Sequence, residues 1–329
     1  MPRLLSAAKR RQANMSEAEI KDLFDAVLRS VAKALVGKDD VTELVFTALV
    51  AGGHVLIEDV PGTGKTTLVT ALARSLDMSF SRIQFTPDVL PSDVTGYTVL
   101  DIKTGERSLV RGPIMNNMVL ADEINRTSPK TQSALLEVMQ EGQVTVDGQT
   151  LKVPQPFMVL ATQNPVEHVG TYPLPEAQLD RFMMKISVGY PTREQETQIL
   201  SSRRAGDPSE TITPVAKADD VLTLRRARTQ ITCAPPVLEY IVQIAEATRR
   251  DERIALGISP RGSLALADAA AARAMLHGRS FVLPDDVQAL AMPVLAHRIV
   301  TSVRNNPSKE SSASLLRGIM RSLRVPAVS

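Results

Sequence analysis

The sequence contains very little cysteine, tryptophan or net charge, and each shortage excludes a class of protein. Its 329 residues include one cysteine, Cys233, which excludes an internal disulfide framework and a four-cysteine zinc site. Seven Phe, four Tyr and no Trp leave little surface for stacking single-stranded nucleic acid. A formal net charge of +2 gives no bulk attraction for nucleic acid. Cys233 lies among Ile, Thr, Ala and Pro, a context typical of a small hydrophobic residue rather than a catalytic thiol.

Long apolar runs are also missing. No run approaches the ~20 apolar residues that span a bilayer, and the best candidate, residues 45–57, is broken by Gly52, Gly53 and His54. The first sixteen residues carry four basic side chains without a following apolar segment. We therefore expect a flexible basic tail over residues 1–16, with a transit peptide as the alternative. These features favour the reducing cytoplasm as the location.

Hydrophobic periodicity indicates that strands alternate with helices in the first half of the chain. Apolar residues recur at helical spacing over 17–35, about 41–49 and 66–76, and a further helix is expected to begin at Ser128 and end at Gly142. The short apolar runs typical of buried strands are 54–57, 118–121 and 157–161. This order predicts an α/β fold, in which helices cover both faces of a parallel sheet.

The same patterns predict where the domains begin and end. The α/β core is expected over 17–190, with two irregular, hairpin-like segments at about 86–117 and 143–153. A linker would occupy 191–217. From about Ala218 only helical patterns recur, so we expect a small all-helical domain over 218–300. The polar residues 301–329 are expected to form a loosely held C-terminal extension.

A glycine-rich segment between a predicted strand and a predicted helix has the residue types of a phosphate-binding loop. Glycines allow backbone N–H groups to close around a phosphate, and the helix N-terminus adds a positive dipole end. Lys65 can bridge the β- and γ-phosphates, and the Thr66 hydroxyl can bind Mg²⁺. The strict pattern has Gly where this chain has Asp59, and the alternative is a plain strand–helix turn. The predicted phosphate-binding residues are Pro61, Gly62, Thr63, Gly64, Lys65, Thr66 and Thr67.

Two adjacent carboxylates, Asp122 and Glu123, follow the predicted strand 118–121. Asp122 can hold Mg²⁺ through water, and Glu123 can orient and deprotonate an attacking water. Such a pair alone is usually a solvated turn. After a phosphate-binding loop it favours nucleotide hydrolysis over simple nucleotide binding. The chain has no Asn-Lys-x-Asp stretch for reading guanine.

Together these motifs resemble those of the MoxR family of AAA+ ATPases over roughly residues 32–300. The most specific strings lie at 56–66, 82–88, 121–126, 131–137 and 174–182. The resemblance implies an AAA+ parallel-sheet P-loop core followed by a small all-helical lid domain, with ATP and Mg²⁺ as cofactors. The metal would be held by Thr66 and Asp122. In the family, segments like 86–117 form the helix-2 insert, and segments like 143–153 form the hairpin before sensor 1.

The resemblance also implies roles for residues whose spacing alone is uninformative. Val36 and Gly37 match the segment that contacts adenine. Asn164 matches sensor 1, Arg181 matches the arginine finger that reaches a neighbouring subunit, and Arg261 matches sensor 2, which would meet the nucleotide from the lid.

Each of these roles has a structural alternative. Asn164 could be an ordinary loop residue, Arg181 could form an ion pair with Asp180 or Glu176, and Arg261 could be a plain surface residue. Beside these roles, Arg126 is a further candidate for the subunit interface. Leu283 departs from the family because a capping Ser or Thr is expected before Pro284.

The family resemblance implies a homo-oligomeric ring, expected to be a hexamer, because an arginine finger acts on a neighbour. It further implies a chaperone-like motor that remodels client proteins, with a von Willebrand factor A-domain protein as a partner. The alternatives are a nucleic-acid motor, a metal-chelatase motor subunit and a nucleotide-gated scaffold with little turnover. The acidic hairpin tip at Asp147 and the near-neutral charge argue against nucleic acid as a partner.

Overall fold

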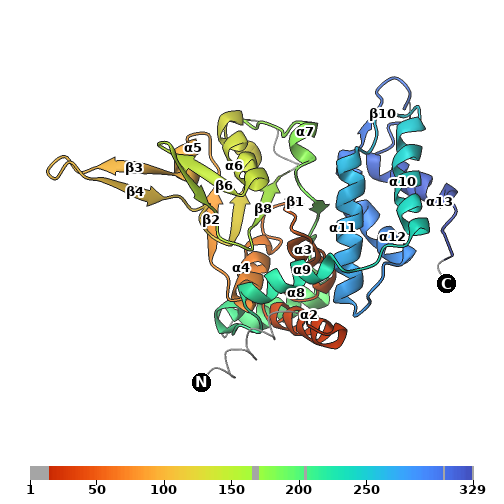
Figure 1. Cartoon of the computed structure of the whole chain (residues 1–329), viewed down its shortest axis with the longest axis horizontal. Coiled ribbons are helices and arrows are strands. Elements are labelled where there is room, and N and C mark those ends of the chain that lie inside the picture. The colour runs from red at the N-terminus through yellow and green to blue at the C-terminus, as the bar shows by residue number, and fades with distance from the viewer. Residues whose placement is uncertain (1–14, 165–169, 204–205, 307, 328–329) are drawn as a thin grey trace.

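A five-stranded, all-parallel sheet forms the centre of the larger part of the molecule (Figure 1). This computed structural model describes residues 15–164, 170–203, 206–306 and 308–327. In spatial order the strands are β2 (Phe80–Gln84), β5 (Met118–Asp122), β8 (Met158–Gln163), β1 (Val55–Glu58) and β9 (Met184–Ile186). The three predicted strands are β1, β5 and β8. The sequence analysis missed β2, which is mostly polar, and β9, which has three residues.

Alternate residues of the central strands pack into two separate hydrophobic clusters, one on each face of the sheet. Ile57 belongs to the cluster that includes residues of α2 (Glu17–Ala32), α3 (Asp39–Ala51) and α4 (Lys65–Ser75). Leu56, its neighbour on β1, belongs to the cluster under α6 (Pro129–Glu141). Because strand side chains alternate between faces, both faces are covered by apolar contacts. The predicted doubly covered parallel sheet is confirmed.

Both irregular segments contain antiparallel hairpins. In the first, α5 (Pro91–Thr95) is followed by β3 (Gly96–Leu100) and β4 (Arg107–Arg111), which extend away from the sheet as a narrow arm (Figure 1). The second pairs β6 (Gln143–Val146) with β7 (Gln149–Lys152). Asp147 and Gly148 join them with φ of 46° and 81°, the positive values that a two-residue type I′ turn requires.

The second domain is not entirely helical, which corrects the sequence-based expectation. Its helices are α10 (Pro235–Arg250), α11 (Pro260–Leu276), α12 (Pro284–Leu295) and α13 (Ser312–Ser322), with the 3-10 turn η3 (Ala296–Arg298). Two very short strands, β10 (Ile254–Leu256) and β11 (Val300–Thr301), pair antiparallel beside them. Strands of two or three residues carry no recognisable alternation in the sequence.

The C-terminal extension is likewise better ordered than expected. Residues 312–322 form α13, and its Leu315, Leu316 and Ile319 are buried in the hydrophobic core of the lid. Their spacing places them on one side of the helix. The expectation of a loosely held segment is therefore wrong for this helix, because its polar composition conceals a continuous apolar stripe.

The predicted linker contains helical structure, and the helix that follows it packs on the core rather than on the lid. Residues 191–217 include α8 (Arg193–Arg203) and the turn η2 (Pro208–Thr211). The next helix, α9 (Ala218–Arg228), packs on the core: Arg225 donates hydrogen bonds to the carbonyl oxygens of Leu49 (2.9 Å) and Phe157 (3.3 Å). Hence α10, and not α9, is the first helix of the lid.

Two helix ends complete the fold. Ser16 caps α2: its Oγ accepts from the Glu19 N–H at 3.3 Å, and its own N–H donates to the Glu19 carboxylate at 2.8 Å. Ser16 is thus ordered, and residues 1–14 of the predicted tail lie outside the described residues. At α12, the Asp286 carboxylate accepts from the Leu283 N–H at 2.9 Å, whereas the Leu283 side chain gives no cap of its own. Among the described residues, no helix combines the length and apolarity needed to cross a membrane.

Candidate active site

A cavity of about 570 Å³ lies at the carboxyl ends of β1, β5 and β8, where ligands of parallel sheets bind. It brings together residues that the sequence analysis named separately. Those lining it are Val36, Pro61, Gly62, Thr63, Gly64, Lys65, Thr66, Thr67, Asp122, Glu123 and Asn164. Of the remaining predicted residues, Gly37 is adjacent to lining residues, whereas Arg181 and Arg261 do not line this cavity.

The phosphate-binding loop joins β1 to α4 and opens its backbone toward the cavity. Gly62 and Gly64 have φ of 85° and 89°, in the left-handed region that side-chain-bearing residues rarely adopt. Lys65, the first residue of α4, donates through Nζ to the carbonyl oxygens of Val60 at 2.9 Å and Asp59 at 3.2 Å. The ammonium group therefore lies inside the loop, next to the N-terminus of α4, where a phosphate would meet both.

Asp59, the departure from the strict loop pattern, has a structural role. Its buried carboxylate accepts hydrogen bonds from the N–H groups of Val188 and Gly189 (3.2 Å) and from the Ser187 hydroxyl (3.0 Å). These residues follow β9. A glycine at position 59 could not make these bonds, so the acid anchors the start of the loop to the chain beyond the sheet edge.

Thr162 on β8 fixes the two carboxylates that follow β5. Its hydroxyl donates to Asp122 Oδ1 at 2.5 Å and accepts from the Glu123 N–H at 2.9 Å. Glu123 has φ 57° and ψ 47°, a left-handed conformation that is uncommon outside glycine and typical of functional sites. The Thr162 hydroxyl therefore holds both the side chain of Asp122 and the backbone of Glu123.

Three partners of these carboxylates were not predicted from the sequence, in which Arg126 was a candidate only for the subunit interface. Arg82 on β2 donates to Asp122 Oδ2 at 2.6 Å through Nη2. Gln84, two residues on, donates to Glu123 Oε2 at 2.9 Å, and Arg126 donates to the same oxygen at 3.0 Å. The signal was the alternation of polar residues along β2 next to β5, which becomes informative only when β2 is known to pair with β5.

The end of the cavity beyond the loop is closed by Val36 and by residues of the expected linker. Pro191, Ile199, Ser202 and Pro208 line it together with Val36.

Gly37 stands just behind this wall. Its carbonyl oxygen accepts from Gln195 Nε2 at 3.3 Å, and Lys38 Nζ donates to the carbonyl oxygen of Tyr190 at 3.0 Å. The segment expected to contact adenine is therefore tied to α8 and the residues before it.

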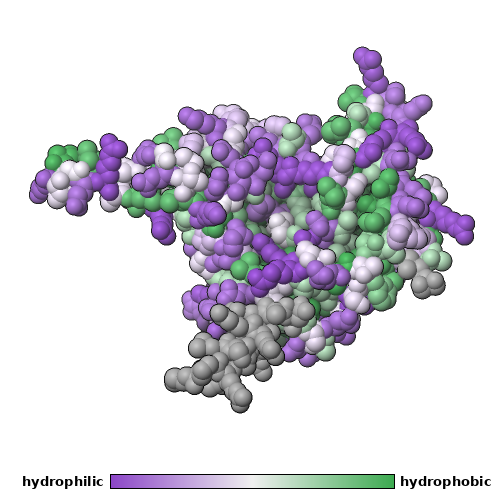
Figure 2. Space-filling model, viewed as in Figure 1, coloured by the Kyte–Doolittle hydropathy of each residue, from purple (hydrophilic) through white to green (hydrophobic). Residues whose placement is uncertain are grey.

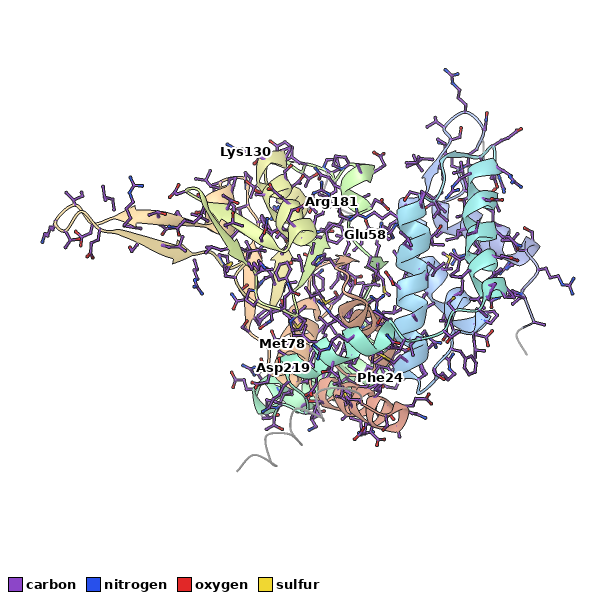
Figure 3. The ribbon with its side chains drawn as sticks, viewed as in Figure 1. Phe24, Glu58, Met78, Lys130, Arg181 and Asp219 are labelled. Atoms are coloured by element: carbon purple, nitrogen blue, oxygen red, sulfur yellow. The ribbon has the colours of Figure 1, made fainter. Side chains whose placement is uncertain are left out.

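Arg181 and Arg261 both line a second, smaller cavity of about 250 Å³, between the start of β1 and α11. Figure 3 shows Arg181 on the side of the core that faces α11. This second cavity shares no lining residue with the first cavity. Arg261 is exposed in the first turn of α11, as predicted from Ser259 and Pro260, and Arg181 follows α7 (Glu176–Leu179). Arg261 does not line the nucleotide cavity of its own chain, so its predicted contact with a nucleotide from the lid stays a prediction.

The acidic groups at the second cavity are already paired within the chain. Asp180 pairs with Arg298 at 2.8 Å, and Asp268 pairs with Arg228. Among the described residues, no carboxylate forms a salt bridge with Arg181 or Arg261. The structural alternative for Arg181, an ion pair with Asp180 or Glu176, is therefore wrong. Within the part of the chain that the structure describes, these two arginines therefore have no salt-bridge partner at this surface.

Comparisons with known proteins agree with this geometry. The family of ATPases associated with various cellular activities matches residues 54–184, and the AAA lid domain matches residues 246–318. Chaperone MoxR1 of Mycobacterium tuberculosis is 39% identical over 95% of this chain and 84% of its own length. The chain belongs to the MoxR family of AAA+ ATPases.

Two further matches each cover more than nine tenths of the chain. The uncharacterized protein YeaC of Bacillus subtilis is 49% identical over 94% of this chain and 97% of its own. A crystal structure from Cytophaga hutchinsonii, assigned there as an ATPase, has a TM-score of 0.88 at 35% identity and covers 98% of this chain and 99% of its own. This MoxR-family chain is thus an ATP hydrolase with an AAA+ core and lid, as the sequence motifs predicted.

Proposed function

We propose that this chain assembles into a ring, expected to be a hexamer, that couples Mg²⁺-dependent ATP hydrolysis to the remodelling of client proteins. One observation carries the proposal: Arg181 and Arg261 lie in a cavity apart from the chain's own nucleotide pocket. Cations without partners at a surface fit a phosphate presented by another molecule. In this proposal, that phosphate belongs to ATP bound by the adjoining subunit.

Within the nucleotide pocket the residues divide the chemistry among them. Lys65 and the loop N–H groups bind the β- and γ-phosphates. The Thr66 hydroxyl and the Asp122 carboxylate are hard oxygen donors on the same wall, the donor set that suits Mg²⁺ together with phosphate oxygens and water. Bound there, Mg²⁺ would neutralise charge on the phosphates. Asn164 faces the same cavity and would orient the attacking water.

Glu123 takes the proton of the attacking water in this proposal. Gln84 and Arg126 both donate to its Oε2, so the carboxylate is held in one orientation before ATP reacts. A base held in place contributes to the rate because little reorganisation remains for the transition state.

Client contact is proposed for the β3–β4 arm. Its outer half exposes large apolar side chains, with Leu100 54% and Ile102 93% accessible, and Figure 2 shows this apolar end standing away from the core. Exposed apolar residues gathered on a projecting segment favour contact with other proteins. The relative MoxR1 is named a chaperone. A von Willebrand factor A-domain partner is proposed on the family resemblance.

The decisive experiment is ATP turnover of Arg181→Ala, measured as phosphate release over a range of protein concentrations. We expect turnover per wild-type chain to rise with concentration and Arg181→Ala to lose about 10³-fold at every concentration, as for arginine fingers generally. Binding of a fluorescent ATP analogue should be retained, because Arg181 lies outside the pocket of its own chain. Wild-type turnover by Arg181→Ala would contradict the proposed action in trans. The exposed lid variant Arg253→Ala is the control and should behave as wild type.

A further inference from the structure

The chain segment that carries Arg181 is held by one buried side chain of the lid, Arg298 in η3. Its Nε donates to Asp180 Oδ1 at 2.8 Å, immediately before Arg181. Its Nη2 donates to the carbonyl oxygen of Phe182 at 2.8 Å, immediately after Arg181, and its Nη1 donates to that of Met183 at 3.2 Å. One guanidinium therefore contacts the residues on both sides of Arg181.

These contacts need an arginine in particular. The Arg298 side chain is only 3% exposed, so each N–H that lost its acceptor would be left without water. A planar guanidinium can reach a carboxylate and several carbonyl oxygens at once, whereas an ammonium is a single point of charge. Burial lowers the pKa of Arg298, and the Asp180 carboxylate opposes that shift. The pair is thus a fixed attachment rather than a mobile surface salt bridge.

The same side chain also reaches the helix turn that carries Arg261. A Cβ on Gly262, the residue after Arg261, would come within 2.9 Å of Arg298 Cδ and 2.8 Å of Ile258 Cγ2. Glycine at this position lets the stem of Arg298 lie against the first turn of α11. Arg298 is therefore packed against one neighbour of Arg261 and hydrogen-bonded to both neighbours of Arg181.

The geometry points to Arg298 as the positioning residue that sets Arg181 and Arg261 relative to each other, so that both reach the ATP of the adjoining subunit. This inference rests on the proposed action of Arg181 in trans. Arg298 itself does not line the nucleotide pocket, and its effect is on the neighbour's hydrolysis. It also joins the lid to the core, so a lid displacement would carry Arg181 with it.

The test uses Arg298→Lys in the full chain, with Asp180→Asn as a second, partly exposed change to the same contact. We expect Arg298→Lys to lower turnover about 10- to 100-fold, the range for a misplaced catalytic group, and Asp180→Asn to lower it less. Affinity for a fluorescent ATP analogue should stay within about twofold for both, since the pocket is unchanged. Arg253→Lys, an exposed lid arginine, is the matched control and should keep wild-type turnover.

Mixing subunits separates positioning from folding. Lys65→Ala subunits have a disabled pocket and an intact Arg181, so adding them to Arg298→Lys subunits should raise turnover about tenfold, because each competent pocket can then face an intact arginine pair. Lys65→Ala/Arg181→Ala subunits should give no increase. Turnover that Lys65→Ala subunits do not restore would overturn the inference, as would wild-type turnover by Arg298→Lys. Loss of assembly by both Arg298→Lys and Asp180→Asn would also overturn it.

Arg181→Ala keeps this inference distinct from the function on which it rests. If Arg181→Ala is inactive while Arg298→Lys is fully active, only the positioning role of Arg298 fails. If Arg181→Ala itself turns over ATP like wild type, the proposed action in trans fails and the positioning role fails with it.

Discussion

The nucleotide pocket and the Arg181 cavity are built in opposite ways. Every carboxylate at the strand ends of the pocket has a partner in the same chain: Asp122 has Arg82, and Glu123 has Arg126. At the Arg181 cavity the acids are paired with other arginines, and Arg181 and Arg261 have no carboxylate partner among the described residues.

The two cavities also differ in which parts of the chain supply their lining residues. The pocket draws its polar lining residues from the ends of neighbouring parallel strands and the loops that follow. The Arg181 cavity joins residues from the start of β1, the end of α6, the segment after α7 and the lid. The difference teaches that acidic groups of the nucleotide pocket are paired within the chain, whereas two arginines of the other cavity are left available for the proposed contact with a second subunit.

Among substitutions in the nucleotide pocket, Glu123→Gln is expected to have the largest effect on ATP turnover. Removing the general base should lower ATP turnover about 10²- to 10⁴-fold while binding persists, because the amide can still accept from Gln84 but cannot take a proton. Phosphate release and binding of a fluorescent ATP analogue measure the two properties. Glu137→Gln, on the exposed side of α6, is the control. Equal phosphate release by Glu123→Gln and wild type would remove Glu123 from the mechanism.

A smaller loss of ATP turnover is expected from Arg261→Ala, at the Arg181 cavity. Turnover should fall about 10- to 100-fold, as when one stabilising cation of several is lost. The affinity of dilute, unassembled chains for a fluorescent ATP analogue should not change, because Arg261 lies outside the pocket of its own chain. A weakened affinity under these dilute conditions would show that Arg261 serves its own pocket, and the contrast between the two regions would disappear.

The smallest expected effect is a loss of folding stability at acid pH, caused by two buried histidines near the Arg181 cavity. Burial lowers the pKa of His54 to about 4 from 6.5, and that of His297 to about 3. His54 lines the Arg181 cavity, and His297 Nε2 lies 3.2 Å from the carbonyl oxygen of Phe182. Among the described residues, the nucleotide pocket is lined by no histidine.

The direction follows from proton linkage. The unfolded chain binds a proton at each site near pH 6.5, whereas the folded imidazole of His54 stays neutral down to about pH 4. The free energy of unfolding should therefore fall as pH drops below 6.5, by up to about 1.4 kcal/mol per pH unit for each buried histidine. Urea unfolding at a series of pH values measures this slope. His54→Gln should roughly halve it, since His297 remains. An unchanged slope in His54→Gln would contradict the burial argument.

Much of the fold was predictable because its signals are local. Ser128 caps α6 and Gly142 follows it with φ 65°, as expected from the residue types. The phosphate loop and Asp122-Glu123 were found from residue types in order along the chain. By contrast, Arg82 and Gln84 became part of the site only through the pairing of β2 with β5, and α13 became part of the lid only through its packing.

The sequence by itself determined the chemistry available at the pocket, because a glycine loop before a helix and two acids after a buried strand keep their roles wherever the sheet forms. Only the tertiary structure decided which cavity each arginine lines. Arg181 and Arg261 are 80 positions apart along the chain, and nothing in their local sequence says that they share a cavity away from Lys65. The position of the lid relative to the sheet decides that, because it results from packing between distant segments such as η3 and the residues around Arg181.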